Sequence, residues 1–573
     1  MPSRKFAALL LPLLTSGFAF AQNFDTSGNG SLKGDYFIRE VLIGGQNATT
    51  GVITSANSVI GVATFDGSGN YSFKGQGTGT GGLGTVIQQA FTGTYSAGAN
   101  GLLAIQSFVS GTENCYGGVS AIGPSAFVAS ATEGSSVDIL VAIPAGPAAS
   151  AGSFKGAYTA GYIDFLNADV NSIRQATFNV TADGAGNLGS VAVTGNAVNL
   201  SSGKATSQTV AGVTYTLGGT GTGTVNFGTA NSGQLISGSK TLYISADGGI
   251  ILGGTPGGFD LLVGIRAVSG PATNATASGV YYLAALEDAV TQSPTVTTHA
   301  IDGYYGSTNA NGAGVAISHN RIQTFAFSVY DFTYNSPFAV GSAGTFSDGQ
   351  FYNYTLGANG SAFIATGSAG YYSLLVGLGA PKFSGPGVYL NPLGIVSAAS
   401  FAPITNPIAP NEIVTIFGSG LSAGTVNAAA TPLPTVLGNV QVLVNGQAAP
   451  LFYVTPGQIA FVVPQKVSPF FKVANATIQV VNNGVKSNPV TVYTSLTAPG
   501  VFSASGNGIG PALAVHLSGA LVTTANPAKV GETVVVYATG LGSTTPTVPD
   551  GFPAPTTTLS PADDTTIEVD FGT

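Results

Sequence analysis

The chain has 573 residues, enough for several domains, and only 7% of them are charged, against about 25% in an average soluble protein. Its formal net charge is −8 with only 16 basic residues, which excludes a basic nucleic-acid-binding surface. Hydrophobic residues make up 44% of the chain, and this argues against disorder. Because valine, threonine, glycine and tyrosine dominate over helix-forming residues, we expect an all-β protein.

The first residues have the pattern of a secretory signal peptide. Arg4 and Lys5 form a basic start, an apolar segment follows, and Ala19-Phe-Ala21 is a small-residue cleavage site. We expect cleavage after Ala21 and a protein that is secreted or held at the cell surface. No later apolar run reaches the ~18 residues that a membrane-spanning helix needs, so none is expected in the mature chain.

Residues 31–381 contain an internal repeat. Three segments begin with Gly-x-Tyr, at offsets of 122 (156 − 34) and 123 (279 − 156) residues: Gly34-Asp-Tyr36, Gly156-Ala-Tyr158 and Gly279-Val-Tyr281. Each segment ends in a matching apolar strand: Asp138 to Ile143, Asp260 to Ile265 and Ser373 to Leu378. The sequence predicts three homologous β-repeats, over residues 31–147, 153–268 and 277–381.

Each repeat also carries a hairpin signal: Asp66-Gly-Ser-Gly-Asn70, Asp183-Gly-Ala-Gly-Asn187 and Asn311-Gly-Ala-Gly-Val315. Asp-Gly and Asn-Gly accept the positive φ of tight turns between antiparallel strands. We expect a closed antiparallel barrel of about eight strands per repeat, with a β-sandwich as the alternative. The alternating oxygen-bearing side chains at Asp66 and Asp183 leave weak calcium binding open as a second interpretation, since the rest of the calcium-loop pattern is missing.

The C-terminal part contains a second duplication. Residues 412–421 and 532–541 share a glutamate, a β-branched run, an aromatic residue and a closing Gly-Leu, at an offset of 120 (532 − 412). This pattern predicts two small β modules, over residues 391–500 and 501–573. About fifty residues follow the second strand of the first module, whereas the chain ends directly after that of the second, so we expect the second module to be incomplete.

A resemblance to a known family rests on this C-terminal part. The segments that show the resemblance are 394–403, 409–421, 440–464 and 483–492. They include a strand–Gly-x-Gly-Leu turn and a Val-Asn-Gly hairpin. The region resembles the uncharacterised C-terminal domain of Solibacter-type secreted proteins and, more broadly, the IPT/TIG immunoglobulin-like modules. The resemblance implies an immunoglobulin-like β-sandwich in a secreted or surface protein. It provides no catalytic residue to carry over.

Residues for catalysis or metal binding are scarce. Gly420-Leu-Ser-Ala-Gly424 fits the G-x-S-x-G pattern, but no helix pattern follows and the duplicated copy lacks the serine, which favours a turn. The three histidines have no metal-ligand spacing. Cys115 is the single cysteine and is interpreted as a small buried hydrophobic residue, with a reactive thiol as the alternative. We expect no cofactor and no enzyme, and the leading enzymatic alternative is a glycan-active hydrolase.

The third repeat is rich in tyrosine, whose ring and hydroxyl suit stacking on sugars as well as core packing. The predicted ligand-contacting residues are Tyr304, Tyr305, Tyr330, Tyr334, Tyr371 and Tyr372. The sequence favours a non-catalytic structural, adhesive or recognition protein, with an extracellular polysaccharide or a surface protein as partner. The alternatives are an array of carbohydrate-binding modules that uses these tyrosines, and a barrel that holds an apolar ligand.

Overall fold

The computed structural model describes residues 24–563, apart from residues 48–51, 121–124, 147–151, 293–296, 326–328, 369, 468–473, 556 and 558. The segment that holds the predicted signal peptide lies outside the described residues. Within them the fold is all-β, and every helical segment is a three-residue 3-10 turn. These turns are η1 (Asn29–Ser31), η2 (Thr80–Gly82), η3 (Leu166–Ala168), η4 (Val170–Ser172), η5 (Asn274–Thr276), η6 (Ala358–Gly360) and η7 (Gln465–Val467).

The first repeat is a closed, eight-stranded antiparallel barrel in which each strand pairs with the next along the chain and the last pairs with the first. Its strands are β1 (Lys33–Gln46), β2 (Ile53–Asp66), β3 (Asn70–Gly79), β4 (Ile87–Ala97), β5 (Leu102–Gln106), β6 (Asn114–Val119), β7 (Phe127–Ala131) and β8 (Val137–Pro144). Closure gives every strand two partners, so this barrel has no exposed sheet edge.

The second repeat closes in the same way, with β16 returning to β9. Its strands are β9 (Lys155–Phe165), β10 (Ile173–Asp183), β11 (Asn187–Ala197), β12 (Leu200–Leu217), β13 (Thr222–Asn226), β14 (Ser239–Ile244), β15 (Ile250–Gly254) and β16 (Asp260–Arg266). The barrel prediction is therefore confirmed over the sandwich alternative for both of these repeats.

The third repeat has the same eight-stranded meander but remains open. Its strands are β17 (Ser278–Gln292), β18 (Thr297–Asn311), β19 (Val315–Thr324), β20 (Tyr330–Pro337), β21 (Thr345–Ser347), β22 (Tyr352–Leu356), β23 (Ala362–Gly367) and β24 (Tyr371–Gly379). The sheet order ends in β20 on one side and β21 on the other, and these two strands do not pair. Two features account for the opening: β21 has three residues, and Pro337 at the end of β20 has no N–H to donate.

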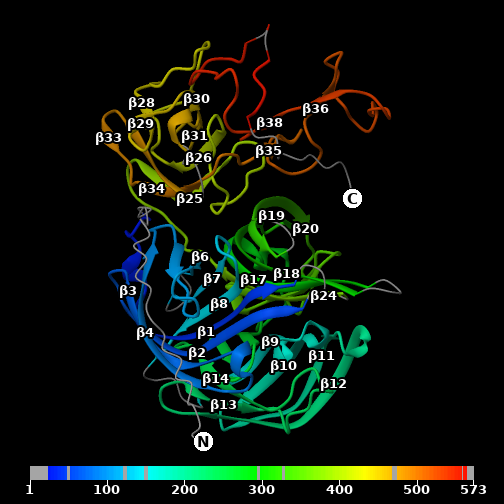
Figure 1. Cartoon of the computed structure of the whole chain (residues 1–573). Helices are drawn as coiled ribbons and strands as arrows, with labels where there is room; N and C mark the ends of the chain where they lie inside the picture. Colours follow the sequence, from blue (N-terminus) through cyan, green and yellow to red (C-terminus); the bar gives the residue numbers. More distant parts are fainter. Residues whose placement is uncertain are drawn as a thin grey trace, which may run out of the picture.

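The C-terminal region lies at one end of the molecule, next to β19 and β20, and the second repeat lies at the other end (Figure 1). One of its sheets has the order β25 (Tyr389–Ser397), β26 (Ile413–Ser419), β31 (Gln458–Val462), β30 (Leu451–Val454) and β27 (Val426–Asn427). The other contains β29 (Gln447–Ala448), β28 (Val440–Val444), β32 (Ala474–Asn482), β33 (Val485–Lys486) and β34 (Val490–Thr494). The described residues after 499 form two ribbons, β35 (Gly500–Val501) with β38 (Ala538–Thr539) and β36 (Ala514–His516) with β37 (Val534–Val536).

The predicted repeat signals have the same geometry in all three units. Gly34, Gly156 and Gly279 have φ of 93°, 99° and 99°, a region that a residue with a Cβ enters only with strain. In each hairpin signal the first side chain accepts two backbone N–H bonds through Oδ1, from the residues two and four positions later. The acceptors are Asp66, Asp183 and Asn311.

The closing strands are buried on both faces because the units pack against one another. Along β8, Ile139 and Val141 belong to a core that the three repeats share with the C-terminal region, while Leu140 fills the barrel interior. Phe37 of the first barrel stacks on Tyr243 of the second, with ring centroids 4.3 Å apart. This double burial explains why the closing strands are continuous apolar runs instead of alternating ones. Among the described residues, no helix is long and apolar enough to cross a membrane.

Candidate functional site

The opening between β20 and β21 exposes side chains that point into the third unit. Tyr330, Phe332 and Tyr334 lie opposite Ile322, Asn320 and Ser318 of β19 in the strand register. Ile322 is part of the interior core, and side chains directly opposite each other share a face of the sheet. Tyr330 and Phe332 nevertheless remain 44% and 50% exposed, because no strand covers them on the open side.

Aromatic side chains also line the other wall. Phe346 of β21 and Tyr354 of β22 are cross-strand neighbours whose rings stack with centroids 4.7 Å apart and an interplanar angle of 3°. Phe332 and Tyr334 stack on the first wall, with centroids 5.2 Å apart. We call this interior, with its open side, the aromatic trench; it comprises Tyr304, Tyr330, Phe332, Tyr334, Phe346, Tyr352, Tyr354, Phe363 and Tyr371. Its enclosed part has a volume of about 50 Å³, so anything larger must lie along the open side.

A buried carboxyl group ties three of the trench tyrosines together. Glu287 accepts hydrogen bonds from Tyr352 Oη at 2.5 Å and from Tyr371 Oη at 3.2 Å, and Tyr352 Oη lies 3.0 Å from Tyr304 Oη. Burial, together with the neighbouring carboxyl of Asp302, raises the pKa of Glu287 to about 8. Burial likewise raises the pKa of Asp302, its cross-strand partner, to about 7. At neutral pH this carboxyl pair carries only part of its full negative charge.

The predicted ligand-contacting tyrosines lie in different environments. Tyr304, Tyr330, Tyr334 and Tyr371 belong to the trench. Adjacent residues on a strand face opposite sides of the sheet. Tyr305 accordingly packs outside the unit, with its ring centroid 5.7 Å from that of Tyr116 of the first barrel. Tyr372 is 1% exposed and is part of the core shared between units. The structure thus brings four of the six together.

Sequence reasoning missed Glu287 and Phe346 as parts of this site. Glu287 and its neighbour Asp288 lie in an otherwise apolar stretch of β17, and two adjacent acidic residues do not reveal that three tyrosines surround one of them. Phe346 is on a three-residue strand between loops, too short for a periodicity signal. One detectable signal was the charge itself, because an acidic residue within a buried strand is rare unless it has partners.

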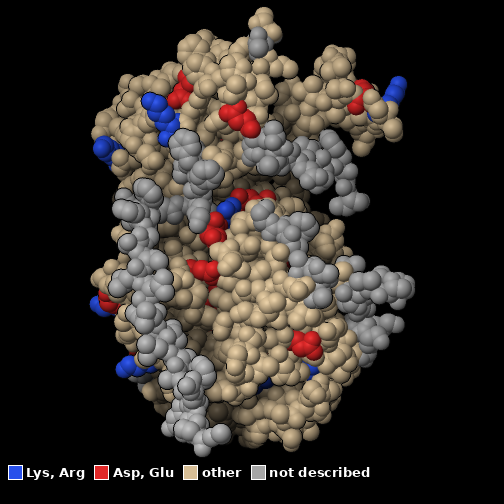
Figure 2. All heavy atoms as spheres, viewed as in Figure 1, with Lys and Arg blue, Asp and Glu red and all other residues tan. Residues whose placement is uncertain are grey.

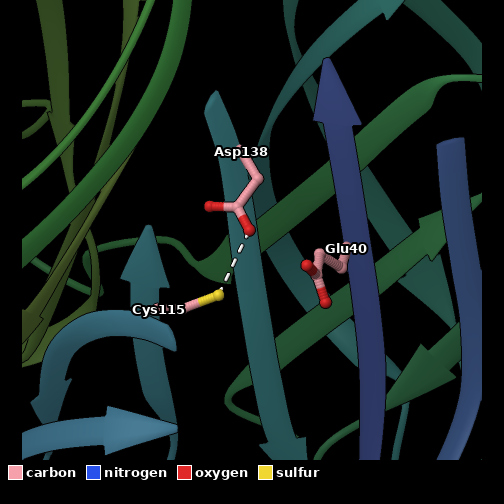
Figure 3. Close-up of side chains that lie close together, drawn as sticks. All are labelled: Glu40, Cys115 and Asp138. Atoms are coloured by element: carbon pink, nitrogen blue, oxygen red, sulfur yellow. Dashed lines mark hydrogen bonds between the residues drawn. The ribbon is translucent and has the colours of Figure 1, made fainter. Parts of the chain in front are cut away.

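A second cluster of polar side chains lies inside the first barrel. Figure 3 shows Asp138 between Cys115 and Glu40. The Cys115 thiol donates to Asp138 Oδ2 at 3.2 Å, and Ala131 N donates to Asp138 Oδ1 at 2.5 Å. Glu40 accepts from Ser107 Oγ at 2.5 Å and from Phe108 N at 2.8 Å. All three side chains are fully buried, which confirms the interpretation of Cys115 as a buried residue.

The cluster has the composition of a metal site but the hydrogen bonding of a structural network. One potential ligand atom from each of Glu40, Cys115 and Asp138 lies within 4.8 Å of the others. Burial raises the pKa of all three groups, and in Glu40 and Cys115 the nearby Asp138 charge adds to the rise. Metal ligands must be deprotonated, whereas this environment favours protonated forms that share hydrogen bonds. The cluster therefore fits a role in holding the 107–111 loop to the barrel.

The remaining sequence candidates have local structural partners. At the turns considered for calcium, Asp66 and Asp183 each accept a side-chain bond from an asparagine four positions later, besides their two backbone bonds. The Asn70 and Asn187 bonds, together with the turn amides, lower the pKa of the two carboxyls, that of Asp183 to about 2. Ser422 Oγ donates to Gly424 O at 2.8 Å, as expected for a turn.

The histidines lie apart from one another. His299 Nδ1 is 2.6 Å from Asp288 Oδ2, His516 Nδ1 is 2.5 Å from Glu532 Oε1, and His319 Nδ1 is 3.1 Å from Thr405 Oγ1. Each therefore has its own hydrogen-bond partner.

Comparison with known proteins gives one family match, over part of the chain. Residues 397–495 match the IPT/TIG domain, which confirms that part of the resemblance and the immunoglobulin-like nature of the region. A comparison with curated proteins finds no match. Among solved structures, a mutant of the vaccine antigen Transferrin Binding Protein B from Haemophilus parasuis Hp5 is similar at 9% identity, over 61% of this chain and 76% of that chain, with a TM-score of 0.17.

Proposed function

We propose that the protein is an exported, non-catalytic recognition protein that binds a neutral saccharide chain along the aromatic trench of its third unit. The observation that carries the proposal is the row Tyr330, Phe332 and Tyr334, whose rings face the interior of the unit and yet remain accessible between β20 and β21. Aromatic faces with nearby hydroxyl groups pack against the C–H faces of sugar rings while the hydroxyls bond the sugar oxygens.

The polar groups of the trench suit an uncharged ligand. The raised pKa of Glu287 keeps this carboxyl largely protonated below about pH 8. Few charged side chains are present on the face of the molecule seen in Figure 2.

Location outside the cell is part of the proposal. The first 21 residues have the pattern of a signal peptide, and the IPT/TIG match supplies a rigid immunoglobulin-like module that suits a surface scaffold. The partner that this reading favours is an extracellular polysaccharide. An apolar ligand inside the first two barrels is disfavoured, because buried aromatic and aliphatic side chains fill both interiors.

The test is binding of the full chain to a panel of neutral polysaccharides, with Phe332→Ala as the trench variant. We expect retention on at least one polysaccharide and about tenfold weaker binding by the variant, the loss typical of one stacking ring. Phe452→Ala is the matched control, because Phe452 is a partly exposed phenylalanine on β30 of the IPT/TIG region. Incubation with the retained polysaccharide is expected to release no new reducing ends.

Three results would count against the proposal. Equal loss of binding in both variants would show that the row of aromatic rings is not part of the binding site. Release of reducing ends would show that the protein is a hydrolase. Absence of any saccharide binding, together with capture of an extended peptide by the unpaired edge of β20, would make the trench a strand-addition site for a protein partner.

A further inference from the structure

A polar cavity lies at the mouth of the second barrel, apart from the trench. It has a volume of about 490 Å³, within the range of small-molecule sites. Its walls come from β9, β10, β14 and β16 and from the 230–238 loop, and Leu83 and Gly84 of the first barrel close one side. The charged side chains that line it are Asp164, Arg174, Lys240 and Asp260.

Asp260 is the centre of a buried ion network. Lys240 Nζ lies 2.7 Å from Asp260 Oδ2, and Arg39 of the first barrel reaches Asp260 Oδ1 through NH2 at 3.2 Å. Although burial opposes ionisation of Asp260, the charges of Lys240 and Arg39 outweigh it, and its pKa is lowered. Asp260 is therefore a carboxylate with two cations beside it.

Asp164 lies directly opposite Asp260 in the strand register. The Tyr162 hydroxyl is 3.1 Å from Asp164 Oδ2 and 3.2 Å from Asp260 Oδ2. The phenol has a single proton to donate, so while it donates to Asp260 it bonds to Asp164 only when Asp164 carries a proton. Burial first, and then the charge of Asp260, raise the pKa of Asp164 to about 6.

Arg174 adds a third buried cation without a carboxylate of its own. Its guanidinium donates to the carbonyls of Ser172, Ser232 and Gln234 and to Asn199 Oδ1. These bonds use four of its five N–H groups, and Lys240 uses two of its three on Asp260 and Thr255. Both cations thus keep a donor beyond these bonds, within a cavity that both of them line.

The buried charges at this cavity do not balance. Arg39, Arg174 and Lys240 are at most 5% exposed and supply three positive charges, whereas Asp164 and Asp260 supply at most two negative ones. Asp169, which precedes the adjacent η4 turn, is exposed and caps that turn by accepting from Asn171 N and Ser172 Oγ. An uncompensated buried charge is costly, and a bound counter-charge removes that cost.

We propose that this cavity binds a small organic anion whose carboxylate or phosphate group lies between Arg174 and Lys240. The anion supplies the missing negative charge, and the volume leaves room for a body of several more atoms with hydroxyl groups facing Ser237, Ser239 and Thr255. Because protonation of Asp164 raises the positive excess from one to two charges, binding tightens as the pH falls from 8 to 5.

The test is calorimetric titration of the full chain with gluconate, inorganic phosphate and sorbitol. Sorbitol has the six-carbon polyol chain of gluconate, with a sixth hydroxyl group in place of the carboxylate, and therefore lacks the charge. We expect saturable binding of gluconate, tighter at pH 5 than at pH 8, and none of sorbitol. Binding of phosphate as tight as that of gluconate assigns the site to phosphate-bearing ligands; weaker phosphate binding assigns it to carboxylates. Equal binding of gluconate and sorbitol, or none of either anion, overturns the proposal.

A charge introduced at the cavity rim tests whether the anion binds in this cavity or elsewhere on the protein. Leu83 is 51% exposed and belongs to the first barrel, so its replacement leaves the ion network and the core intact. Leu83→Glu is expected to weaken anion binding about tenfold and Leu83→Lys to strengthen it, while the neutral Leu83→Gln stays close to wild type. Identical affinities in the glutamate and lysine variants would show that the anion binds elsewhere. Saccharide binding at the trench is expected to be unchanged in all three.

Discussion

Glu412 and Glu532, 120 residues apart (532 − 412), close the same hydrogen-bonded turn. In each case the glutamate N–H donates to the carbonyl three residues earlier, and its Oε2 accepts the N–H of that same residue, Ala409 at 2.8 Å or Lys529 at 2.9 Å. Their environments differ, because Glu412 is fully buried and Glu532 is exposed and paired with His516. The duplicated sequence therefore preserves the backbone turn, whereas the packing around each turn determines whether its glutamate is charged.

The buried carboxyl groups predict that the folded protein loses stability as the pH rises. Burial raises the pKa of Glu412 and of Glu287 to about 8 and that of Asp302 to about 7. Their folded forms bind protons more tightly than the unfolded chain does, so this stabilisation is complete below about pH 4 and is lost as the pH rises to about 8. We expect the thermal midpoint to fall between pH 5 and pH 8, as measured by calorimetry.

Replacement of one buried carboxyl measures its contribution to this pH dependence of stability. Glu412→Gln is expected to reduce the fall in the thermal midpoint between pH 5 and pH 8. Glu532→Gln, at an exposed glutamate, is expected to leave this fall unchanged. A midpoint that rises with pH in the wild type, or equal effects of the two variants, would contradict the assignment of raised pKa values to the buried groups.

The positive φ at the start of each repeat predicts a position-specific cost. Gly279 has φ of 99°, and a Cβ at this position would touch nothing within 4 Å, so Gly279→Ala strains only the backbone. We expect a loss of about 1–2 kcal/mol in unfolding free energy, measured by denaturant titration. Gly270→Ala is the control, because Gly270 has equal space and no positive φ. Similar losses in the two variants would refute the conformational explanation.

One side chain of the second barrel makes four hydrogen bonds to the third unit. Gln175 Oε1 accepts from Gly367 N at 2.7 Å and Ser373 N at 2.9 Å, and its Nε2 donates to Gly367 O at 2.6 Å and Tyr371 O at 2.9 Å. Gln175→Ala leaves these four backbone groups without partners.

We expect Gln175→Ala to cost about 3 kcal/mol and to speed hydrogen exchange in β23 and β24. Gln88→Ala, at an exposed glutamine of β4, serves as the control. Unchanged exchange in β23 and β24 of the Gln175 variant would show that the two units hold together without this contact.

The environment of Cys115 predicts an inert thiol. The side chain is fully buried, and burial together with the Asp138 charge raises its pKa, so the reactive thiolate is scarce. We expect a thiol reagent to modify the native protein only as fast as the barrel unfolds, and to modify it at once in denaturant. Rapid modification under native conditions would instead make Cys115 an accessible site.

The repeated β architecture could be predicted from the sequence because each repeat contains residues that a particular backbone conformation requires. Gly34, Gly156 and Gly279 each need positive φ, and Asp66 and Asp183 each close an Asx turn, so both signals are local and independent of packing. Opening of the third barrel was not predictable in this way. It depends on the absence of pairing between β20 and β21, a long-range relation that no local pattern reports.

The trench was predictable only in part, for a related reason. Alternation of side chains along a strand separates Tyr304 from Tyr305 and Tyr371 from Tyr372, but it does not tell which of each pair faces inward. The answer comes from neighbours on other strands: Tyr304 contacts Tyr352 inside the unit, whereas Tyr305 meets Tyr116 of another barrel. Such contacts join residues far apart in the chain.

The most direct measurement of the central claim is hydrogen exchange of the full chain, with and without a saturating neutral saccharide from the binding panel. The account predicts that amides of β20 and β21, whose outer edges are unpaired, exchange rapidly in the free protein and become protected when the saccharide is bound. Protection confined to other parts of the chain, with β20 and β21 unchanged, would contradict the assignment of the binding site to the aromatic trench.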